Sequence, residues 1–258
     1  MLTIENRGMA LSDPVSGRWT TSKMAQDALF VLDHLNWKSQ IHVVGLSMGG
    51  MIAQEVCKLG KGRFASLTLL STIAGGFYSL GYFLYCLPSG VQLTLRANLS
   101  SSGQERLKHT LRIMYPDSFL QSNVPHPTDP NKTITNFDIF RKTLIRRALE
   151  EKRKGIPVSP VSSVIKQIFA VSTHNVTLDQ LAEISKSVNG NVLVVTGDED
   201  ILVHMANSRR LHEGLKGELM IFKGAGHGAF EQCANEVNAA IEKLVLKASK
   251  SAPTQARL

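Results

Sequence analysis

The segment "IHVVGLSMGGMIAQE" at residues 41–55 constrains the fold of this chain more than any other. A short run rich in β-branched residues leads into Gly45, and helical spacing of apolar residues follows Ser47 directly. In a Gly-x-Ser-x-Gly turn between strand and helix, small residues at 45 and 49 let a strained turn pass close to its neighbours. The backbone N–H of Met48 would then lie near a developing oxyanion. The pattern predicts Ser47 as a nucleophile; a purely structural serine in a tight turn is the alternative.

A regular alternation of strand and helix patterns surrounds this turn. Residues 20–36 place apolar side chains on one side of a helix, with Thr21 or Ser22 as its N-cap. Gly60 ends the helix after the turn, and residues 65–71 form a second buried strand. Later strand patterns cover 191–197 and 218–224, and later helical patterns lie near 204–214 and 229–247. This rhythm predicts an α/β fold, in which helices cover both faces of a mostly parallel sheet.

The rhythm is interrupted in the middle of the chain. Strand signals disappear there, and helical stretches alternate with polar loops such as residues 123–133. We therefore expect a core in two parts, residues 1–75 and 174–249, separated by a mostly helical cap or lid at 76–173. The polar tail at 250–258 is expected to be flexible.

A serine hydroxyl becomes a strong nucleophile only beside a base, most often a histidine. Among the eight histidines, His227 stands in "GAGHGAF", directly after a buried strand and before the last helix. Small residues there let the loop fold over the carboxyl edge of the sheet, where open α/β sheets bind ligands. A packed or solvated side chain explains the other seven: His34, His42, His109, His126, His174, His204 and His212. We therefore predict His227 as the base.

An acid that orients the imidazole is expected at the end of the preceding core strand. The segment "VVTGDEDILV" at 194–203 offers Asp198, Glu199 and Asp200 there. Its place between the serine and the histidine gives the chain order serine, acid, histidine. We prefer Asp200 as the acid, with Asp198 in reserve; a helix-capping role is the alternative for either residue.

These segments resemble the α/β-hydrolase superfamily, and within it the capped esterase, lactonase and epoxide-hydrolase-like group with a serine nucleophile. In that family the acid lies three residues after the glycine, which favours Asp200. A proline is common where His204 stands, so the chain departs from the family there. A serine at the turn argues against epoxide hydrolases and haloalkane dehalogenases, which use aspartate. The matching segments span nearly the whole chain: residues 6–12, 42–50, 194–203 and 224–231.

The resemblance also implies that the N-terminal strands of the family are missing. Many more residues than the 46 present here normally precede the nucleophile. The fourth family strand is reduced to "LTIE" (2–5), and the only His-Gly pair is His227-Gly228. The loop that ordinarily gives the second oxyanion N–H is therefore absent, and Met48 supplies the single donor. We expect an N-terminally truncated form with unpaired sheet edges and with turnover lowered by about 10²–10³.

The expected activity is that of a serine hydrolase acting on a small or medium hydrophobic ester, lactone or thioester through an acyl-enzyme. Acyl transfer, a catalytically impaired isoform and a ligand-binding protein of the same descent are the alternatives. No metal or organic cofactor is implied. Five aromatic residues favour an apolar substrate lid, although a lid helix merely packed on the core, or a helix at a membrane interface, would also explain them: Phe77, Tyr78, Tyr82, Phe83 and Tyr85.

Charge and terminal patterns bear on partners and location. The net charge is +8, but the basic stretch at 141–155 comes without zinc-ligand spacing or an RNA-binding motif. We therefore do not expect nucleic acid as a partner. No apolar run spans a membrane, no secretory signal is found, and three cysteines suggest a reducing compartment. The ending Ala256-Arg257-Leu258 resembles a peroxisomal address and predicts an import receptor as partner, with the cytoplasm as alternative. Nothing in the sequence indicates an oligomeric state.

Overall fold

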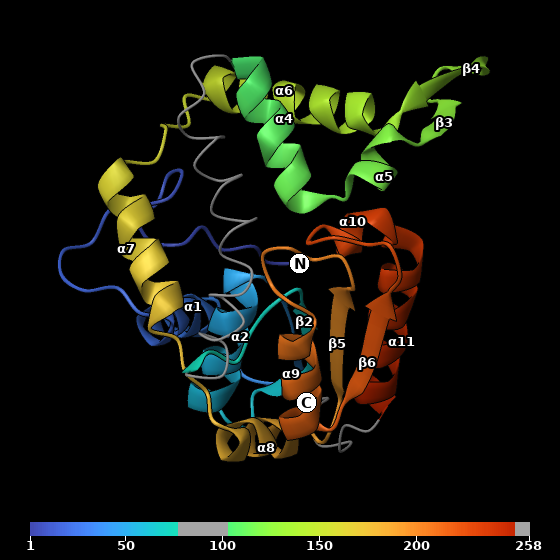
Figure 1. Ribbon diagram of the computed structural model, residues 1–258. Helices are drawn as coiled ribbons and strands as arrows, with labels where there is room; N and C mark the ends of the chain where they lie inside the picture. The colour runs from blue at the N-terminus through green and yellow to red at the C-terminus, as the bar shows by residue number, and fades with distance from the viewer. Residues whose placement is uncertain (77–102, 251–258) are drawn as a thin grey trace.

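A computed structural model describes residues 1–76 and 103–250 of the chain (Figure 1). The aromatic cluster at 77–85 and the C-terminal tripeptide lie outside the described residues. The strands are β1 (Ile41–Leu46), β2 (Phe64–Leu70), β3 (Asn123–His126), β4 (Asp129–Thr135), β5 (Val192–Gly197) and β6 (Glu218–Phe222). The helices are α1 (Thr21–His34), α2 (Met48–Leu59), α4 (Gly103–Met114), α5 (Asp117–Gln121), α6 (Asn136–Arg153), α7 (Val161–Ser172), α8 (Leu178–Ser187), α9 (Ala206–Leu215), α10 (Ala229–Gln232) and α11 (Ala234–Lys250).

The core is a parallel sheet with the strand order β1-β2-β5-β6. Every residue of β2 and β5 is buried, as expected for central strands of a sheet that is covered on both faces. Val43 pairs with Leu67, and Leu69 pairs with Val194. The predicted α/β class with a mostly parallel sheet is confirmed.

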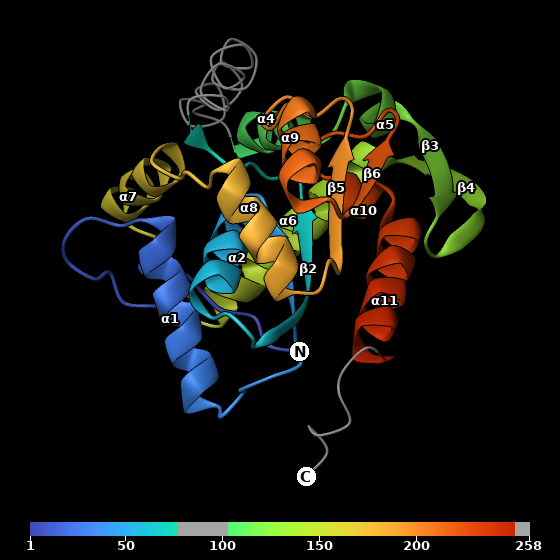
Figure 2. The same cartoon turned by 90° about the horizontal axis from the view of Figure 1, so that it is seen from below.

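Alternate residues of the central strands feed two separate hydrophobic clusters, because neighbouring side chains on a strand point to opposite faces. Leu67 and Leu69 join Val192 and Val194 beneath α1, α2, α8 and α9. On the opposite face, Leu193 packs with neighbours from β5, β2 and α11. Figure 2 shows α1, α2 and α8 on one side of these strands and α11 on the other. Helices therefore cover both faces, as predicted.

The elements between β2 and β5 include a strand pair that the sequence interpretation missed. Strands β3 and β4 form an antiparallel hairpin over the stretch that was predicted to be a polar loop. Its prolines concealed it: Pro125 can lie in a strand only where its missing N–H is not needed, as at an edge. The chain leaves the core at Gly75 and returns at Asn175, and an isolated β-bridge joins these two residues. The domain limits proposed from the sequence stay a prediction.

Two other expectations about elements were wrong, and one helix was not predicted. The N-cap of α1 is Thr20, whose extended backbone lets its hydroxyl accept from the Lys23 N–H. The last helical pattern is two helices, because the backbone at Cys233 is not helical, and the second helix continues to Lys250. The helix α8 was not predicted, although Thr177 begins a capping box at its start.

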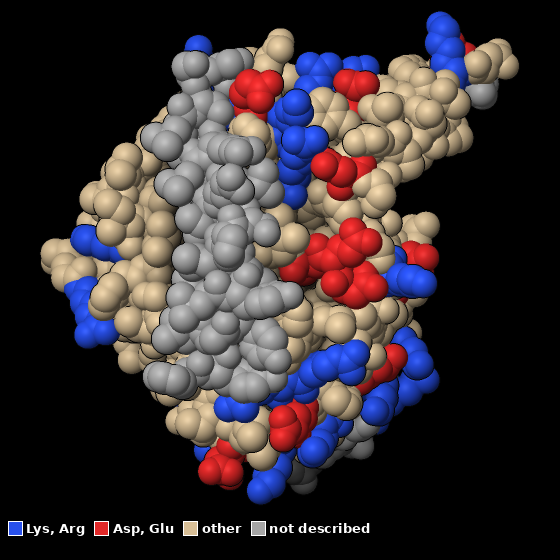
Figure 3. All heavy atoms as spheres, viewed as in Figure 1, with Lys and Arg blue, Asp and Glu red and all other residues tan. Residues whose placement is uncertain are grey.

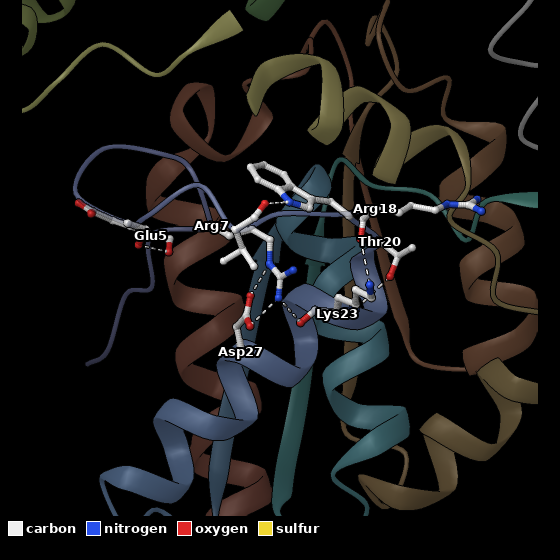
Figure 4. Close-up of polar contacts among 9 residues, drawn as sticks. Glu5, Arg7, Arg18, Thr20, Lys23 and Asp27 are labelled. Carbon is white, nitrogen blue, oxygen red and sulfur yellow. Dashed lines mark hydrogen bonds and ion pairs between the residues drawn. The ribbon is translucent and has the colours of Figure 1, made fainter. Parts of the chain in front are cut away.

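The N-terminal segment lies against α1 without forming a strand, so the expectation that "LTIE" is the remainder of one was wrong. Leu2 packs on the cluster beneath α1. Arg7 holds Asp27 of α1 through two hydrogen bonds, from Nε at 2.8 Å and from Nη2 at 2.7 Å (Figure 4). Trp19, further along, is completely buried. Side-chain packing and one ion pair thus position this segment.

Strand β1 is the end of the sheet within the described residues, since it pairs only with β2. Val44 of this strand is 51% exposed, on the face where α11 covers β2 and β5. The expected N-terminal truncation stays a prediction.

Candidate active site

Ser47 occupies the turn between β1 and α2 with a backbone conformation that is rare for a residue with a side chain. Its φ is 51° and its ψ is −120°. Such strained conformations persist only where the surroundings enforce them, and they gather at functional sites. Two bonds enforce this one: the Ser47 N–H donates to Leu70 O at 2.9 Å, and the Thr72 hydroxyl donates to Ser47 O at 2.6 Å.

Two positions in this turn, Gly45 and Gly50, have no room for a side chain. A Cβ on Gly45 would stand 2.4 Å from Gly49 O, and one on Gly50 would stand 2.6 Å from the Thr72 Cβ. Gly49 has open space around it, so the expectation that position 49 must be small for close approach was wrong. The glycine that passes close to a neighbouring segment is Gly50, the next one along the chain, which faces Thr72 after β2.

Met48 is the first residue of α2, so its backbone N–H has no acceptor within the helix. The positive end of the helix dipole is directed at the same point. The Ser47 carbonyl meanwhile accepts from Gly50 and Met51. An oxyanion formed beside Ser47 would therefore meet at least this one donor.

His227 and Asp200 form a buried hydrogen-bonded pair. The Nδ1 of His227 lies 2.8 Å from Oδ2 of Asp200, with side-chain exposures of 5% and 0%. The other carboxylate oxygen, Oδ1, accepts from the backbone N–H groups of Leu202 at 2.9 Å and Val203 at 2.8 Å. The carboxylate is thus held on both oxygens, which sets the direction of the imidazole ring.

The two loops that carry this pair are joined by a close backbone approach. A Cβ on Gly197 would stand 2.0 Å from Ala225 O, so only glycine fits at the end of β5. The Glu199 N–H donates to Ala225 O at 2.9 Å. Asp198, the reserve acid, is exposed and accepts from Gly224 N–H at 2.7 Å, away from the imidazole. The structure therefore pairs the histidine with the preferred acid.

Ser47, Asp200 and His227 follow the carboxyl ends of β1, β5 and β6. Because these strands are parallel, all three residues lie at the same edge of the sheet. Within the described part of the chain, no hydrogen bond joins the Ser47 hydroxyl to His227. The structure thus brings two of the three predicted residues into direct contact and places the third at the same edge.

Tyr115, which follows α4, is a residue of this region that the sequence interpretation missed. A Cβ on Gly228 would stand 2.3 Å from its ring, and the Gly228 N–H donates to Met114 O at 2.8 Å. The Tyr115 hydroxyl donates to Glu231, and burial together with this bond raises the pKa of Tyr115. The contact joins residues far apart in sequence, so no local pattern could have revealed it.

Other titratable groups are accounted for by packing. His42 on β1 contacts the Ser66 hydroxyl at 2.8 Å, and burial lowers its pKa. Burial also raises the pKa of the Cys57 thiol to about 12. Residues 1–76 and 103–250 contain no group of three or more His, Cys, Asp or Glu that could hold a metal ion. Over the same ranges, no helix is long and apolar enough to cross a membrane.

Comparisons with known proteins agree with this architecture. A family model described as "alpha/beta hydrolase fold" matches residues 1–233. The chain is 23% identical over 246 residues to a Pseudomonas putida protein, the dihydrolipoyllysine-residue acetyltransferase component of an acetoin cleaving system. That match covers 92% of this chain and 55% of the relative, so the chain spans about half the length of the relative.

Two solved structures extend the comparison. A Mycobacterium tuberculosis protein named as a putative non-heme bromoperoxidase has a TM-score of 0.67 at 19% identity, with 95% of this chain and 80% of that chain covered. A thermophilic esterase from Thermogutta terrifontis has a TM-score of 0.63 at 20% identity, with coverages of 95% and 78%. At these identities the likeness shows the fold alone.

Proposed function

Because the chain belongs to the α/β-hydrolase fold family, we propose that it is a serine hydrolase acting on a small or medium hydrophobic ester, lactone or thioester. The observation that carries the proposal is the buried Asp200–His227 pair at the sheet edge where Ser47 is held in a strained turn. A strained serine, an oriented imidazole and a backbone donor are the parts that acyl transfer requires.

In the proposed reaction, Nε2 of His227 takes the Ser47 proton while Oγ attacks the substrate carbonyl carbon. The Met48 N–H stabilises the oxyanion, and His227 then gives the proton to the leaving alcohol or thiol. Water, activated by the same imidazole, releases the acid from the acyl-enzyme. Asp200 keeps Nδ1 protonated and offsets the charge of the imidazolium. The Ser47–His227 hydrogen bond forms as substrate binds, because catalytic hydrogen bonds commonly tighten only in the complex.

Aromatic side chains that border the His227 loop support the proposal of an apolar substrate. Tyr115 packs against Phe140, with ring centroids 4.5 Å apart, and against Phe119 at 5.7 Å. Aromatic surfaces beside a catalytic edge favour apolar acyl or ring groups over charged polymers. We assign the elements between β2 and β5 to a lid above the site.

The test is active-site labelling with a fluorophosphonate, which reacts with an activated serine. We expect one label on Ser47 and none in Ser47→Ala, with Ser71→Ala as the control because Ser71 is also a positive-φ serine at a strand end. Unchanged labelling of Ser47→Ala would refute the proposal.

A ligand-binding protein of the same descent is the second candidate. Two observations favour it: the Ser47 hydroxyl makes no hydrogen bond to His227, and β1 is left as the end of the described sheet. This candidate requires a cooperatively folded protein that neither labels nor turns over a panel of generic esters, yet is thermally stabilised by hydrophobic acids or esters. Labelling of Ser47 with turnover excludes it.

Acyl transfer to a nucleophile other than water is a variant of the main proposal. The Pseudomonas putida relative is named as an acetyltransferase component, which makes a thiol acceptor worth testing. Turnover of a thioester in the presence of a second thiol separates the two outcomes. A new thioester product indicates transfer, and free acid alone indicates hydrolysis.

A further inference from the structure

The helix α7 carries its aliphatic side chains on the outside. Val161 is 75% exposed, Ile165 is 60% exposed and Ile168 is 63% exposed. These positions recur at the spacing of one helix face. In the connection before α7, Val158 is 95% exposed. An apolar stripe on a solvent-facing helix loses the free energy that its burial would supply, which indicates a partner for this face.

The inner face of α7 is occupied by small and polar residues instead. Ser163 and Ala170 are buried, and a Cβ on Gly8 would stand 2.6 Å from the Ser163 hydroxyl. Lys166 lies over the ring of Trp19 at 5.0 Å, and Arg18 lies over the ring of Phe169 at 4.5 Å. The N-terminal segment that holds these contacts is drawn in Figure 4, with Arg18 labelled. The helix is therefore fixed to the core by its less apolar side.

The exposed apolar residues are concentrated in this part of the molecule. Of nineteen exposed large hydrophobic side chains among the described residues, eight lie between positions 145 and 169. Two of them, Ile145 and Leu149, belong to α6, which directly precedes α7. In Figure 3 the surface over α7 is mostly uncharged, with Lys or Arg side chains at its outer edge, and both basic and acidic side chains lie over α4 and α6.

Basic residues accompany these apolar ones. Residues 141–154 contain seven Lys or Arg and two Glu, which gives a net charge of +5. Lys142, Arg146 and Arg153 are exposed and border Ile145 and Leu149. Lys152 and Lys154, also exposed, stand where α6 ends and the connection to α7 begins. Cationic and aliphatic side chains thus lie side by side on α6, next to the connection that leads to α7.

We propose that the surface formed by α6, residues 154–160 and α7 docks on a membrane that contains anionic phospholipids. The cations of α6 contact the headgroups, and the aliphatic face of α7 enters the boundary between headgroups and acyl chains. Binding of a peripheral helix to a membrane strengthens with the apolar area it buries and with its attraction to anionic lipids, and this surface supplies both.

Charge complementarity selects this occupant over a second copy of the chain. A symmetric dimer through the same face would bring two segments of +5 together, and like charges in an interface oppose association. An anionic lipid surface neutralises these charges and covers the α7 aliphatics in one event.

The test is co-sedimentation of the full chain with vesicles of phosphatidylcholine alone and of phosphatidylcholine mixed with phosphatidylserine. We expect binding to the mixed vesicles, weaker binding to the neutral ones, and a fall in binding as salt is raised. The double variant Ile165→Ser/Ile168→Ser should lower the partition coefficient by about tenfold or more. Arg146→Glu/Arg153→Glu should lower it on the order of tenfold to hundredfold on mixed vesicles.

Matched controls alter exposed residues elsewhere. Phe30→Ser on α1, where the side chain is 73% exposed, is the apolar control, and Lys243→Glu/Lys250→Glu on α11 is the charge control. Both should bind as the wild type does, and all variants should keep the wild-type circular dichroism and melting temperature.

Three outcomes overturn the proposal. The first is no sedimentation with mixed vesicles at low salt. The second is binding that the charge variant abolishes and the Ile165/Ile168 variant leaves unchanged, which reports electrostatic adsorption without insertion. The third is a concentration-dependent dimer in analytical ultracentrifugation that Ile165→Ser/Ile168→Ser dissolves, with no vesicle binding, which identifies a second copy as the occupant.

Discussion

At Gly45 the main chain has no room for one more carbon atom, because Gly49 O and the Gly50 Cα both lie where a Cβ would stand. Both are backbone atoms of the turn that holds Ser47, so they cannot move aside without disturbing it. Gly45→Ala should lower the free energy of unfolding by about 2–3 kcal/mol. The measurement is urea unfolding followed by circular dichroism.

Gly49→Ala is the matched control, four residues away in the same motif. The site is open, and alanine favours helix, so this variant should lie within about 1 kcal/mol of wild type, on the stable side. Equal losses in the two variants would show that Gly45 is not the crowded position.

The two aspartates after β5 should differ sharply in their effect on turnover. Asp200 accepts from His227 Nδ1 and from two backbone N–H groups, whereas Asp198 accepts from Gly224 at an exposed position. On the proposed mechanism, Asp200→Asn lowers kcat by about 10³–10⁴, because an amide no longer selects the right imidazole tautomer. Asp198→Asn should stay within about tenfold of wild type. Steady-state ester hydrolysis separates them, and similar losses would contradict the assignment.

The candidate site was largely predictable from local patterns. Ser47, Asp200 and His227 each follow a strand of the parallel sheet, and short motifs rich in glycine or acidic residues mark such positions in the sequence. Tyr115 was not predictable, because its partner Glu231 is 116 residues away and only tertiary packing joins them. Position 49 was misjudged for a related reason, since the free space around a residue is set by tertiary neighbours that the sequence does not display.

At the scale of elements, the turn between α4 and α5 should anchor the loop that carries His227. The Tyr115 ring fills the space above Gly228, and its hydroxyl reaches Glu231 on α10. Tyr115→Ala should cost about 3–5 kcal/mol of stability and speed amide exchange in residues 224–232. Tyr115→Phe keeps the ring and loses one bond to an exposed carboxylate, so it should cost about 1 kcal/mol.

The measurements are thermal unfolding and hydrogen exchange read by mass spectrometry. If Tyr115→Phe lowered stability as much as Tyr115→Ala, the hydrogen bond of the hydroxyl rather than the packing of the ring would hold the His227 loop against the turn between α4 and α5. Unchanged exchange in the His227 loop of Tyr115→Ala would mean that the loop is held from the sheet side alone.

The central strands were predictable because they are buried. The strands β2 and β5 are buried at every residue and stand out as apolar runs. The hairpin of β3 and β4 has proline and polar residues along an exposed pair, so its pattern matches a loop. In α8, the capping box at Thr177 and Gln180 was the available signal.

At the scale of the whole molecule, stability is divided among three hydrophobic clusters. Two lie on the faces of the sheet, and the third lies among α4, α5 and α6. The chain returns to the sheet at His174 and Asn175, which bond to Gly76 and Gly75 on the outgoing segment. A change at this junction therefore acts on the attachment of all the elements between β2 and β5.

His174 makes this junction sensitive to acid. Its Nδ1 lies 2.9 Å from the Thr21 hydroxyl, and its Nε2 is buried without a partner within the described chain. Burial, with a smaller contribution from the charge of Lys58, lowers the pKa of His174 from its ordinary 6.5 to about 4. A protonated imidazole would bury a charge and leave an N–H group unpaired.

At pH values between these two pKa values, His174 is mostly protonated in the unfolded chain and mostly neutral in the folded chain. The free energy of unfolding should therefore fall as the pH is lowered from about 6.5 to about 4, by about 3 kcal/mol from this residue alone, and no further below that. His174→Gln can still bond to Thr21 and does not titrate, so its unfolding free energy should depend less on pH in this window. The measurement is urea unfolding at a series of pH values, with His34→Gln, at an exposed histidine, as the control that keeps the wild-type slope. If His174→Gln also kept that slope, the acid sensitivity would have to arise from other groups, because the junction histidine would then be protonated alike in both states.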